Sequence, residues 1–164
     1  MLMQRTLVLI KPDGIQRGLI GEVIQRFERA GLKIIGMKMV HVNEEFARKH
    51  YTEDIEIRRG AKVRKLLTDA ISTSPVIAIV LEGIEAIEVV RKLVGSTEPK
   101  SALPGTIRGD FCHVSYGQAD VTGKIVYNIV HASGDAKDAA MEVPLWFSDS
   151  ELVDYKTVHE YHVF

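Results

Sequence analysis

Short apolar runs and spaced apolar patterns alternate along the chain, and the two arrangements predict different secondary structure. Residues 6–10 and 76–81 are continuous runs of apolar and β-branched residues, which are typical of buried strands. Residues 33–42 alternate loosely between apolar and polar positions, and residues 124–130 form a further strand-like stretch. The pattern therefore predicts four strands.

Two longer segments place their apolar side chains at helical spacing. In residues 19–30 the apolar positions share one face with charged residues opposite, and Gly31 follows as a helix stop. Residues 85–94 repeat this pattern and end at Gly95. Three shorter helices are predicted at residues 43–50, with Asn43 as the N-cap, at 61–71 and at 136–142.

The order of these elements predicts an α+β fold of the βαββαβ type, a four-stranded antiparallel sheet with helices on one face. No linker, repeat or low-complexity stretch divides residues 1–164, so we expect a single domain. The same topology carries RNA-binding modules as well as enzymes, and it leaves the function open.

Charge and composition narrow the function. Lys and Arg number 21 and Asp and Glu 22, a net charge of -1, whereas proteins that bind nucleic acid through its phosphates usually have a basic excess. The strands at residues 6–10 and 76–81 also lack the aromatic side chains that stack on exposed bases. We therefore expect no nucleic-acid partner, while a small phosphate ligand, which needs only a few cations, is compatible with this charge.

Cys112 is the single cysteine, which excludes an intrachain disulfide and a cysteine-based metal cluster. The first apolar run, ending at Ile10, is too short for a secretory signal. No apolar run approaches the ~18 residues of a membrane span. We expect a cytoplasmic protein that does not cross a membrane.

Residues 117–125 resemble a phosphate-binding loop but do not fit one. Five residues rather than four separate Gly117 from Gly123, and Ile125 stands where a Ser or Thr would coordinate magnesium. We interpret the stretch as a surface turn or hairpin. Phosphate binding is then expected elsewhere.

Three cations are better candidates for phosphate binding. Lys11 directly follows the first predicted strand, Arg91 lies late in a predicted helix, and Arg108 lies in a glycine-containing segment. Taken singly, each is more often a solvated surface charge. An arginine on a glycine-rich loop is nevertheless well suited to phosphate, because its planar fork bonds two oxygens at once.

His131 is the main candidate for a reactive residue. It stands at the end of a predicted strand and before a predicted helix, and Glu142 follows eleven positions later. That carboxylate would hold one ring nitrogen as N–H and leave the other free to attack. The alternative is a core histidine satisfied by hydrogen bonds. His50 has no partner that the sequence identifies.

Three motifs together resemble the nucleoside diphosphate kinase family: residues 9–14 (LIKPDG), 104–111 (PGTIRGDF) and 128–133 (NIVHAS). Weaker similarities follow in the same order as in the family, at residues 17–21, 50–51, 81–83, 145–147 and 151–155. The resemblance runs from about Arg5 to Tyr155. Several motifs in the family's order are far more specific than any one of them.

The resemblance implies a ferredoxin-like βαββαβ core and a ping-pong phosphoryl transfer that depends on Mg²⁺. His131 would take the γ-phosphoryl group from ATP or another nucleoside triphosphate and pass it to a nucleoside diphosphate. Ser133 and Glu142 match the residues that support this histidine, and Lys11 is counted with the catalytic group. The nucleotide-binding positions of the family are matched by Lys11, Tyr51, Arg91, Thr97, Arg108 and Asn128.

The resemblance also implies an assembly and a mode of metal binding. The family forms hexamers or tetramers, with the loop around Pro104 near the subunit contacts, and we expect a homohexamer. Mg²⁺ is carried mainly by the nucleotide phosphates, so no protein residue is assigned as a metal ligand.

The sequence departs from the family pattern at three places. Gly134 separates Ser133 from Asp135, where the family has the aspartate directly after the serine. Residues 53–60 lack the aromatic residue that stacks on the base in the family, so no residue is assigned to the base. Residues 113–126 are interpreted as an insertion within the domain.

Two alternatives to a kinase follow from these features. One is a nucleic-acid-binding module on the same topology, which the charge and the strands disfavour. The other is a catalytically impaired member of the family that acts as an interaction protein. Every phosphate-binding position and the histidine position are filled, which favours the active enzyme.

Overall fold

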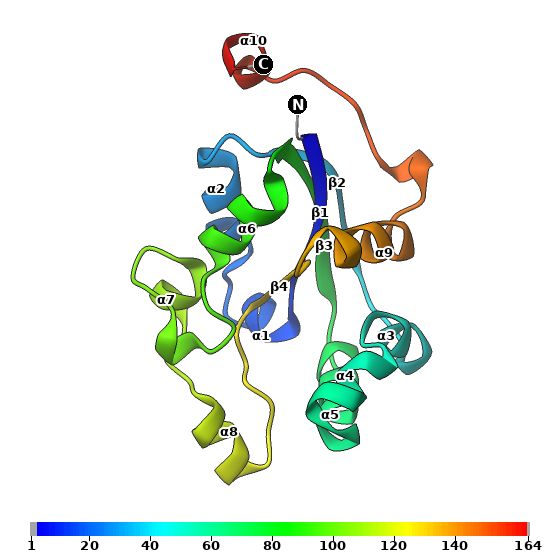
Figure 1. Cartoon of the computed structure of the whole chain (residues 1–164), viewed down its shortest axis with the longest axis vertical. Coiled ribbons are helices and arrows are strands. Elements are labelled where there is room, and N and C mark those ends of the chain that lie inside the picture. Colours follow the sequence, from blue (N-terminus) through cyan, green and yellow to red (C-terminus); the bar gives the residue numbers. More distant parts are fainter. Residues whose placement is uncertain (1–2, 164) are drawn as a thin grey trace.

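The computed structural model describes residues 3–163 and contains one four-stranded antiparallel sheet (Figure 1). Its strands are β1 (Met3–Ile10), β2 (Lys33–Val40), β3 (Val76–Ile84) and β4 (Val130–Ala132). The spatial order β2-β3-β1-β4 places the first and third strands in the centre, as a βαββαβ unit requires. The predicted fold class is confirmed.

The strand register fixes which residues meet at the end of the sheet. β1 pairs with β3 along its whole length, and Leu7 lies opposite Val80. β4 pairs only with the last residues of β1, so that His131 lies opposite Leu9. This short ladder therefore brings His131 within two residues of Lys11 on the neighbouring strand end.

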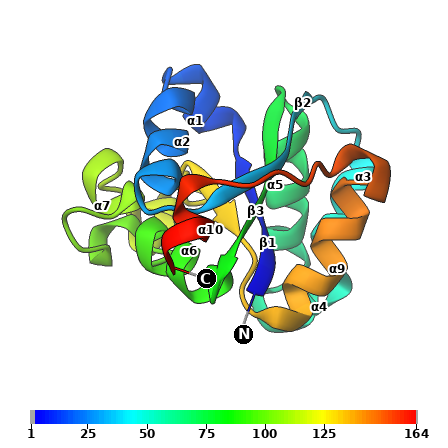
Figure 2. The ribbon, with the colours of Figure 1, turned by 90° about the horizontal axis from the view of Figure 1, so that it is seen from above.

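The connecting helices lie on both sides of the sheet (Figure 2). The crossover helices α2 (Ile20–Arg29) and α6 (Ala86–Val94) cover one face, as predicted. The opposite face is also covered, by α3 (Glu44–His50), α5 (Ala61–Ser72) and α9 (Ala136–Trp146). The shorter elements are α1 (Pro12–Gln16), α4 (Glu53–Arg59), α7 (Ile107–Phe111), α8 (Tyr116–Thr122), α10 (Val158–Val163) and two 3₁₀ turns, Pro99–Ser101 and Asp149–Glu151.

The core has two parts because the central strands are buried on both faces. Val8 and Ile10 of β1 belong to the buried cluster that also contains Phe27 of α2 and Val90 of α6. Leu7 and Leu9, which alternate with them, point into the other cluster. The continuous apolar run at residues 6–10 is the sequence signature of this double burial.

Two predicted elements were wrong. Residues 116–122 form the helix α8, capped by Ser115 and ending at Gly123 with φ +65°, rather than a surface turn or hairpin. The fourth strand is Val130–Ala132 rather than 124–130. The strand starts late because Ile129, with φ +68°, leaves the extended conformation just before it.

Helix α9 continues beyond its predicted end at Glu142. Pro144 lies inside it and removes one backbone hydrogen bond, yet the helix runs on to Trp146. Trp146 is buried and its indole N–H donates to the buried ring of His50. Tertiary packing therefore holds the last turn that local propensity would end.

The C-terminal segment crosses the edge of the sheet along β2. The backbone N–H of Val153 donates to the carbonyl of Ile35 at 2.7 Å, and the hydroxyl of Tyr155 donates to the carbonyl of Ile34. The buried ammonium of Lys33 binds the carboxylates of Asp154 and Glu160. In residues 3–163, no helix is long and apolar enough to cross a membrane.

Removal of the predicted N-cap should destabilise the helix that carries His50. The side chain of Asn43 accepts a hydrogen bond from the backbone N–H of Phe46 at 2.9 Å. We expect Asn43→Ala to lower the free energy of unfolding by about 1 kcal/mol in urea denaturation, and Asn43→Asp to keep most of it. Equal stabilities of the Ala and Asp variants would contradict this role.

Candidate active site

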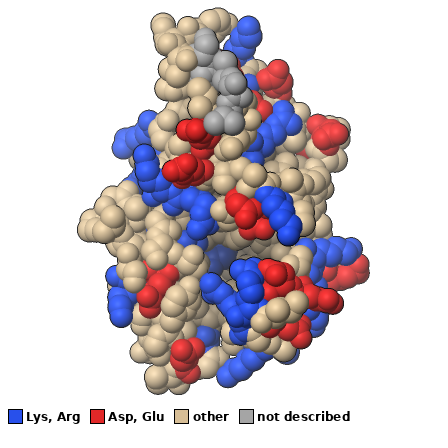
Figure 3. All heavy atoms as spheres, viewed as in Figure 1, with Lys and Arg blue, Asp and Glu red and all other residues tan. Residues whose placement is uncertain are grey.

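Most of the predicted site residues line one cavity of 230 Å³ between the end of the sheet and the helices α4 and α5, whereas Ser133 and Glu142 lie outside its lining. Figure 3 shows Lys and Arg side chains gathered around this hollow. The structure brings together here the histidine and all the predicted nucleotide-binding residues, namely Lys11, Tyr51, Arg91, Thr97, Arg108, Asn128 and His131.

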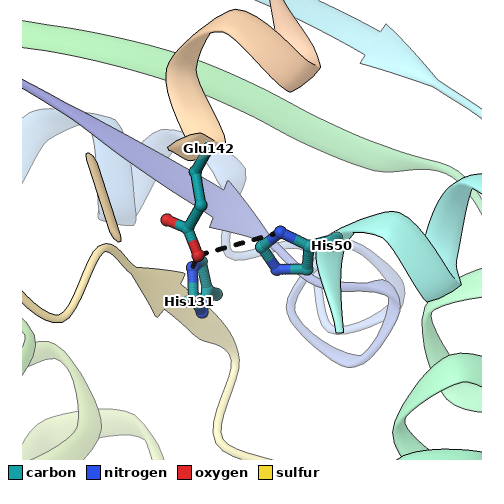
Figure 4. A group of neighbouring side chains, drawn as sticks. All are labelled: His50, His131 and Glu142. Atoms are coloured by element: carbon teal, nitrogen blue, oxygen red, sulfur yellow. Dashed lines mark hydrogen bonds and ion pairs between the residues drawn. The ribbon is translucent and has the colours of Figure 1, made fainter. Parts of the chain in front are cut away.

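The ring of His131 lies against the carboxylate of Glu142 (Figure 4). Its Nε2 lies 2.8 Å from Oε1 of Glu142, and the other carboxylate oxygen accepts a hydrogen bond of 2.6 Å from the hydroxyl of Ser133. The serine hydroxyl in turn accepts the backbone N–H of Leu7, which ties the group to β1. Because Nε2 is engaged, Nδ1 is the ring nitrogen available to a ligand, and no hydrogen bond reaches it from residues 3–163.

Glu142 is ionised in this arrangement. Burial alone would raise its pKa, but the hydrogen bonds from His131 and Ser133 outweigh burial and lower the pKa below its ordinary value. The charged carboxylate therefore fixes the proton on Nε2 of His131.

His50 is a site residue that the sequence analysis missed. Its Nδ1 accepts the indole N–H of Trp146 at 3.2 Å, so its own proton is on Nε2, a buried atom without a hydrogen-bond partner in the described chain. Its ring stands edge-on to that of His131, with the centroids 4.6 Å apart. The one available signal was its place beside Tyr51 in a family motif.

His50 is neutral, so it does not compete with His131 for the charged carboxylate of Glu142. Burial first, and then the neighbouring His131, lower the pKa of His50 to about 3. Its Nδ1 lies 3.8 Å from Oε1 of Glu142, the contact drawn in Figure 4. With a neutral ring, that contact is not an ion pair.

Arg108 is buried and uses much of its guanidinium for structure. Its N–H groups donate to the carbonyl oxygens of Gly95 at 3.0 Å, Val130 at 2.7 Å and Asn128 at 3.3 Å. Burial, and after it the charge of Arg91, lower the pKa of Arg108 to about 10, so it is charged near neutral pH. Its remaining N–H capacity faces the cavity.

Lys11 and Asn128 form a pair at the floor of the cavity. The ammonium of Lys11 donates to Oδ1 of Asn128 at 2.5 Å, and the amide of Asn128 donates to the carbonyl of Thr97 at 2.8 Å. Burial lowers the pKa of Lys11 to about 8, although Asp13 partly opposes the shift. Burial also raises the pKa of Tyr51, whose hydroxyl therefore stays protonated.

A strained residue shapes the chain between Asn128 and His131. Ile129 is β-branched, yet its φ is +68°, a region that such side chains rarely adopt. Its N–H donates to Asp13 at 2.9 Å and its carbonyl accepts the N–H of Lys11 at 2.7 Å. These two bonds hold the kink that turns Asn128 and His131 toward the same cavity.

Further residues line the cavity without having been predicted. Helix α4 contributes Ile55, Arg58 and Arg59, and none of these is aromatic. Asp138 also lines it, at the start of α9. Asp135, displaced by Gly134 from its place in the family pattern, caps α9 by accepting the N–H of Asp138.

Comparisons with known proteins match the chain to one family. The family model for nucleoside diphosphate kinase matches residues 4–152. The nucleoside diphosphate kinase of Borreliella burgdorferi is 52% identical over 157 residues, which are 95% of this chain and 94% of the relative. That of Pyrococcus furiosus is 49% identical over 152 residues, 93% of this chain and 88% of the relative.

Solved structures give the same result. A transition-state mimic of the Borrelia burgdorferi enzyme with bound vanadate and ADP has a TM-score of 0.95 at 51% identity, covering 97% of this chain and 95% of that one. The Halobacterium salinarum nucleoside diphosphate kinase in complex with CDP has a TM-score of 0.83 at 37% identity, covering 98% of each chain.

The fold and the cation-lined cavity define the class of protein, a phosphotransferase that binds nucleotides. The chain belongs to the nucleoside diphosphate kinase family. It is accordingly an enzyme that transfers a phosphoryl group from a nucleoside triphosphate to a nucleoside diphosphate.

The lowered pKa of Lys11 predicts proton uptake on nucleotide binding. With its pKa at about 8, the ammonium of Lys11 has lost most of its proton in the free enzyme at pH 8.5, and we expect bound phosphates to restore it. Calorimetry of ADP binding at pH 8.5 in buffers of different ionisation enthalpy should detect uptake of about three-quarters of a proton, falling toward zero at pH 6.5. Lys11→Met should abolish the effect, and a heat independent of the buffer in the wild type would contradict the assignment.

Proposed function

We propose that this enzyme works by a ping-pong mechanism through phosphorylation of His131 at Nδ1. The observation that carries the proposal is the bond between Nε2 and Glu142, which leaves the lone pair of Nδ1 directed to a cavity lined by cations. In the first half-reaction Nδ1 attacks the γ-phosphorus of ATP or another nucleoside triphosphate. The bond from this phosphorus to the β,γ-bridging oxygen breaks, and the diphosphate leaves with that electron pair.

In the second half-reaction an oxygen of the β-phosphate of another nucleoside diphosphate attacks the phosphorus. The P–N bond breaks and its electron pair returns to Nδ1, so the enzyme ends as it began. The relative with vanadate and ADP bound together supports this order, because such a pair imitates a phosphoryl group next to a diphosphate.

Glu142 and Ser133 act as the support of the nucleophile. When Nδ1 gains a phosphoryl group the imidazole becomes positive, and the carboxylate 2.8 Å from Nε2 stabilises that charge. The hydroxyl of Ser133 fixes the other carboxylate oxygen. Neither residue transfers a proton in either step.

The remaining site residues hold the nucleotide. Arg91 and Arg108 bind and neutralise phosphate oxygens, and Tyr51 and Thr97 add hydroxyl hydrogen bonds. Lys11 acts twice: it cancels charge on the transferred phosphoryl group, and with Asn128 it reaches the sugar hydroxyls. Phosphoryl transfer needs mainly such positioning and charge cancellation.

Mg²⁺ is proposed as the metal cofactor and enters with the nucleotide. Of the residues that line the cavity in the described chain, Asp138 alone has a carboxylate, whereas five are Lys or Arg: Lys11, Arg58, Arg59, Arg91 and Arg108. This donor set fits a metal held by phosphate oxygens and not a protein cage. When bound, the ion supplies further neutralisation of phosphate charge.

Assembly and location follow from the surface and the sequence. Met37 and Met39 on the edge strand β2 are each more than half exposed, and Leu103 beside Pro104 is 73% exposed. Apolar side chains of this size on a surface favour contacts with other copies of the chain, consistent with a homohexamer. We propose a cytoplasmic enzyme, because a chain with one cysteine needs no oxidising compartment.

His131→Ala should abolish nucleotide phosphotransfer and leave ADP binding close to that of the wild type. The reason is that the variant loses the nucleophile but keeps the cations that hold the phosphates. Incubation with labelled ATP should give an acid-labile, base-stable phosphoprotein with the wild type and none with the variant. Substantial turnover by the variant would exclude this mechanism.

Glu142→Gln should slow phosphorylation of His131 by about 10²-fold, with little change in ATP binding. The amide still accepts the Nε2–H bond but offers no charge to the cation that forms. The rate is measured by quench-flow at saturating ATP. Glu88→Gln on the exposed side of α6 serves as the control, and equal rates in both variants would remove Glu142 from the mechanism.

A further inference from the structure

The chain that enters β4 makes a turn that its central residue disfavours. The carbonyl of Asn128 accepts the N–H of Val130 at 2.7 Å, and the residue between them, Ile129, has a φ of +68°. These two features are those of a classic γ-turn, which is rare and strained. A β-branched residue remains in such a conformation only where the surrounding contacts fix its backbone.

The contacts that fix this turn come from the start of α1, which lies beside the chain leading to β4 (Figure 1). The carboxylate of Asp13 accepts the N–H of Ile129 at 2.9 Å, and the N–H of Lys11 donates to the carbonyl of Ile129 at 2.7 Å. Arg108 supports the turn only at the flanking carbonyls. Of the two bonds to Ile129, the one from Asp13 is made by a side chain, so a substitution can remove it.

The start of α1 also packs closely on the turn. A Cβ added at Gly14 would lie 2.8 Å from Cγ2 of Ile129 and 3.2 Å from its carbonyl oxygen, so a side chain at position 14 would displace the turn. Gly14 and Asp13 follow Lys11 in the motif at residues 9–14. Close packing accounts for the glycine and phosphate binding for the lysine, and the hydrogen bond to Ile129 gives the aspartate a purpose.

The turn controls the position of Asn128 more than that of His131. His131 is fixed separately, by its pairing with Leu9 of β1 and by its bond to Glu142. Asn128 lies on the other side of the turn, and its amide oxygen accepts the ammonium of Lys11. A change in the turn therefore acts first on the pair formed by Asn128 and Lys11.

We propose that Asp13 is a positioning residue of the reaction, whose carboxylate holds the γ-turn at Ile129. The turn keeps Asn128 and Lys11 within reach of the sugar hydroxyls of a bound nucleotide. This inference rests on the proposed function, in which these two residues bind the sugar. Asp13 does not line the cavity at His131, so it acts through them. A nucleotide whose sugar is held less firmly is less well aligned with the nucleophile, and such misplacement lowers the rate.

The test compares ATP with 2′,3′-dideoxy-ATP, which lacks both sugar hydroxyls, by quench-flow measurement of His131 phosphorylation. The assay is run at pH 6.5, where Lys11, with its pKa at about 8, carries its proton. Asp13→Ala should lower the second-order rate constant for ATP about tenfold and that for dideoxy-ATP much less, because contacts with the hydroxyls are lost. The ratio of the two rate constants should be well above one in the wild type and fall toward one in the variant.

Two further variants distinguish positioning from a general loss of structure. Asp13→Asn keeps an oxygen that accepts the N–H of Ile129, so it should retain most of the wild-type ratio. Asp69→Ala removes an exposed carboxylate that pairs with Lys65 on α5, and it should leave the ratio unchanged. An Asp13→Ala variant that loses both rate constants by the same factor would overturn the inference, and so would equal ratios in Asp13→Asn and Asp13→Ala.

A double variant tests whether Asp13 acts through Asn128. In the Asn128→Ala background, Asp13→Ala should lower the rate constant for ATP little further, whereas independent losses that multiply would contradict the proposal. Labelled ATP separates this inference from the proposed mechanism. A wild type that forms no phosphohistidine refutes both, whereas a phosphorylated wild type whose ratio Asp13→Ala leaves unchanged refutes only the role of Asp13.

Discussion

The buried guanidinium of Arg108 is the interaction on which the rest of the site depends. A charge taken out of water needs close partners, and here carbonyl oxygens of Gly95, Asn128 and Val130 supply them. These carbonyls belong to the end of α6 and to the chain entering β4, so one side chain sets the spacing between them. Asn128 in turn receives the ammonium of Lys11. The cations that line the cavity at His131 are thus placed by contacts with the chain that surrounds it.

Burial shifts the pKa values of the two titratable neighbours of His131 in opposite directions: it raises that of Glu142 and lowers that of His50. Glu142 keeps its negative charge because His131 and Ser133 hydrogen-bond to it, whereas His50, which has only the indole of Trp146 as donor, is held neutral. A protonated His50 would compete for the carboxylate and weaken its hydrogen bond with Nε2 of His131. The site therefore depends on the different surroundings of the two groups: His50 is buried, whereas the side chain of Glu142 is 12% exposed and is hydrogen-bonded by two side chains.

Much of the fold followed from hydrophobic spacing, and the errors have local causes. Four elements were predicted close to their observed bounds, namely the strands at 6–10 and 76–81 and the helices at 19–30 and 85–94. The strands are continuous apolar runs, and the helices repeat an apolar position at each turn, so both patterns are readable in the sequence. The prediction of a turn or hairpin at α8 was wrong because it gave too much weight to Gly117 and Gly123. Gly117 nevertheless lies inside the helix, and only Gly123 ends it.

The sequence by itself determined three of the four strands and the family, since each is marked by an apolar pattern or a group of short motifs, and the same motifs predicted the phosphate-binding and histidine positions. Only the tertiary structure decided that the ring of His50 lies against that of His131 and that Ile129 has a positive φ. These contacts join residues far apart in the chain, and no local spacing encodes them. They arise because the end of the sheet, α3 and α9 are brought together only when the core forms.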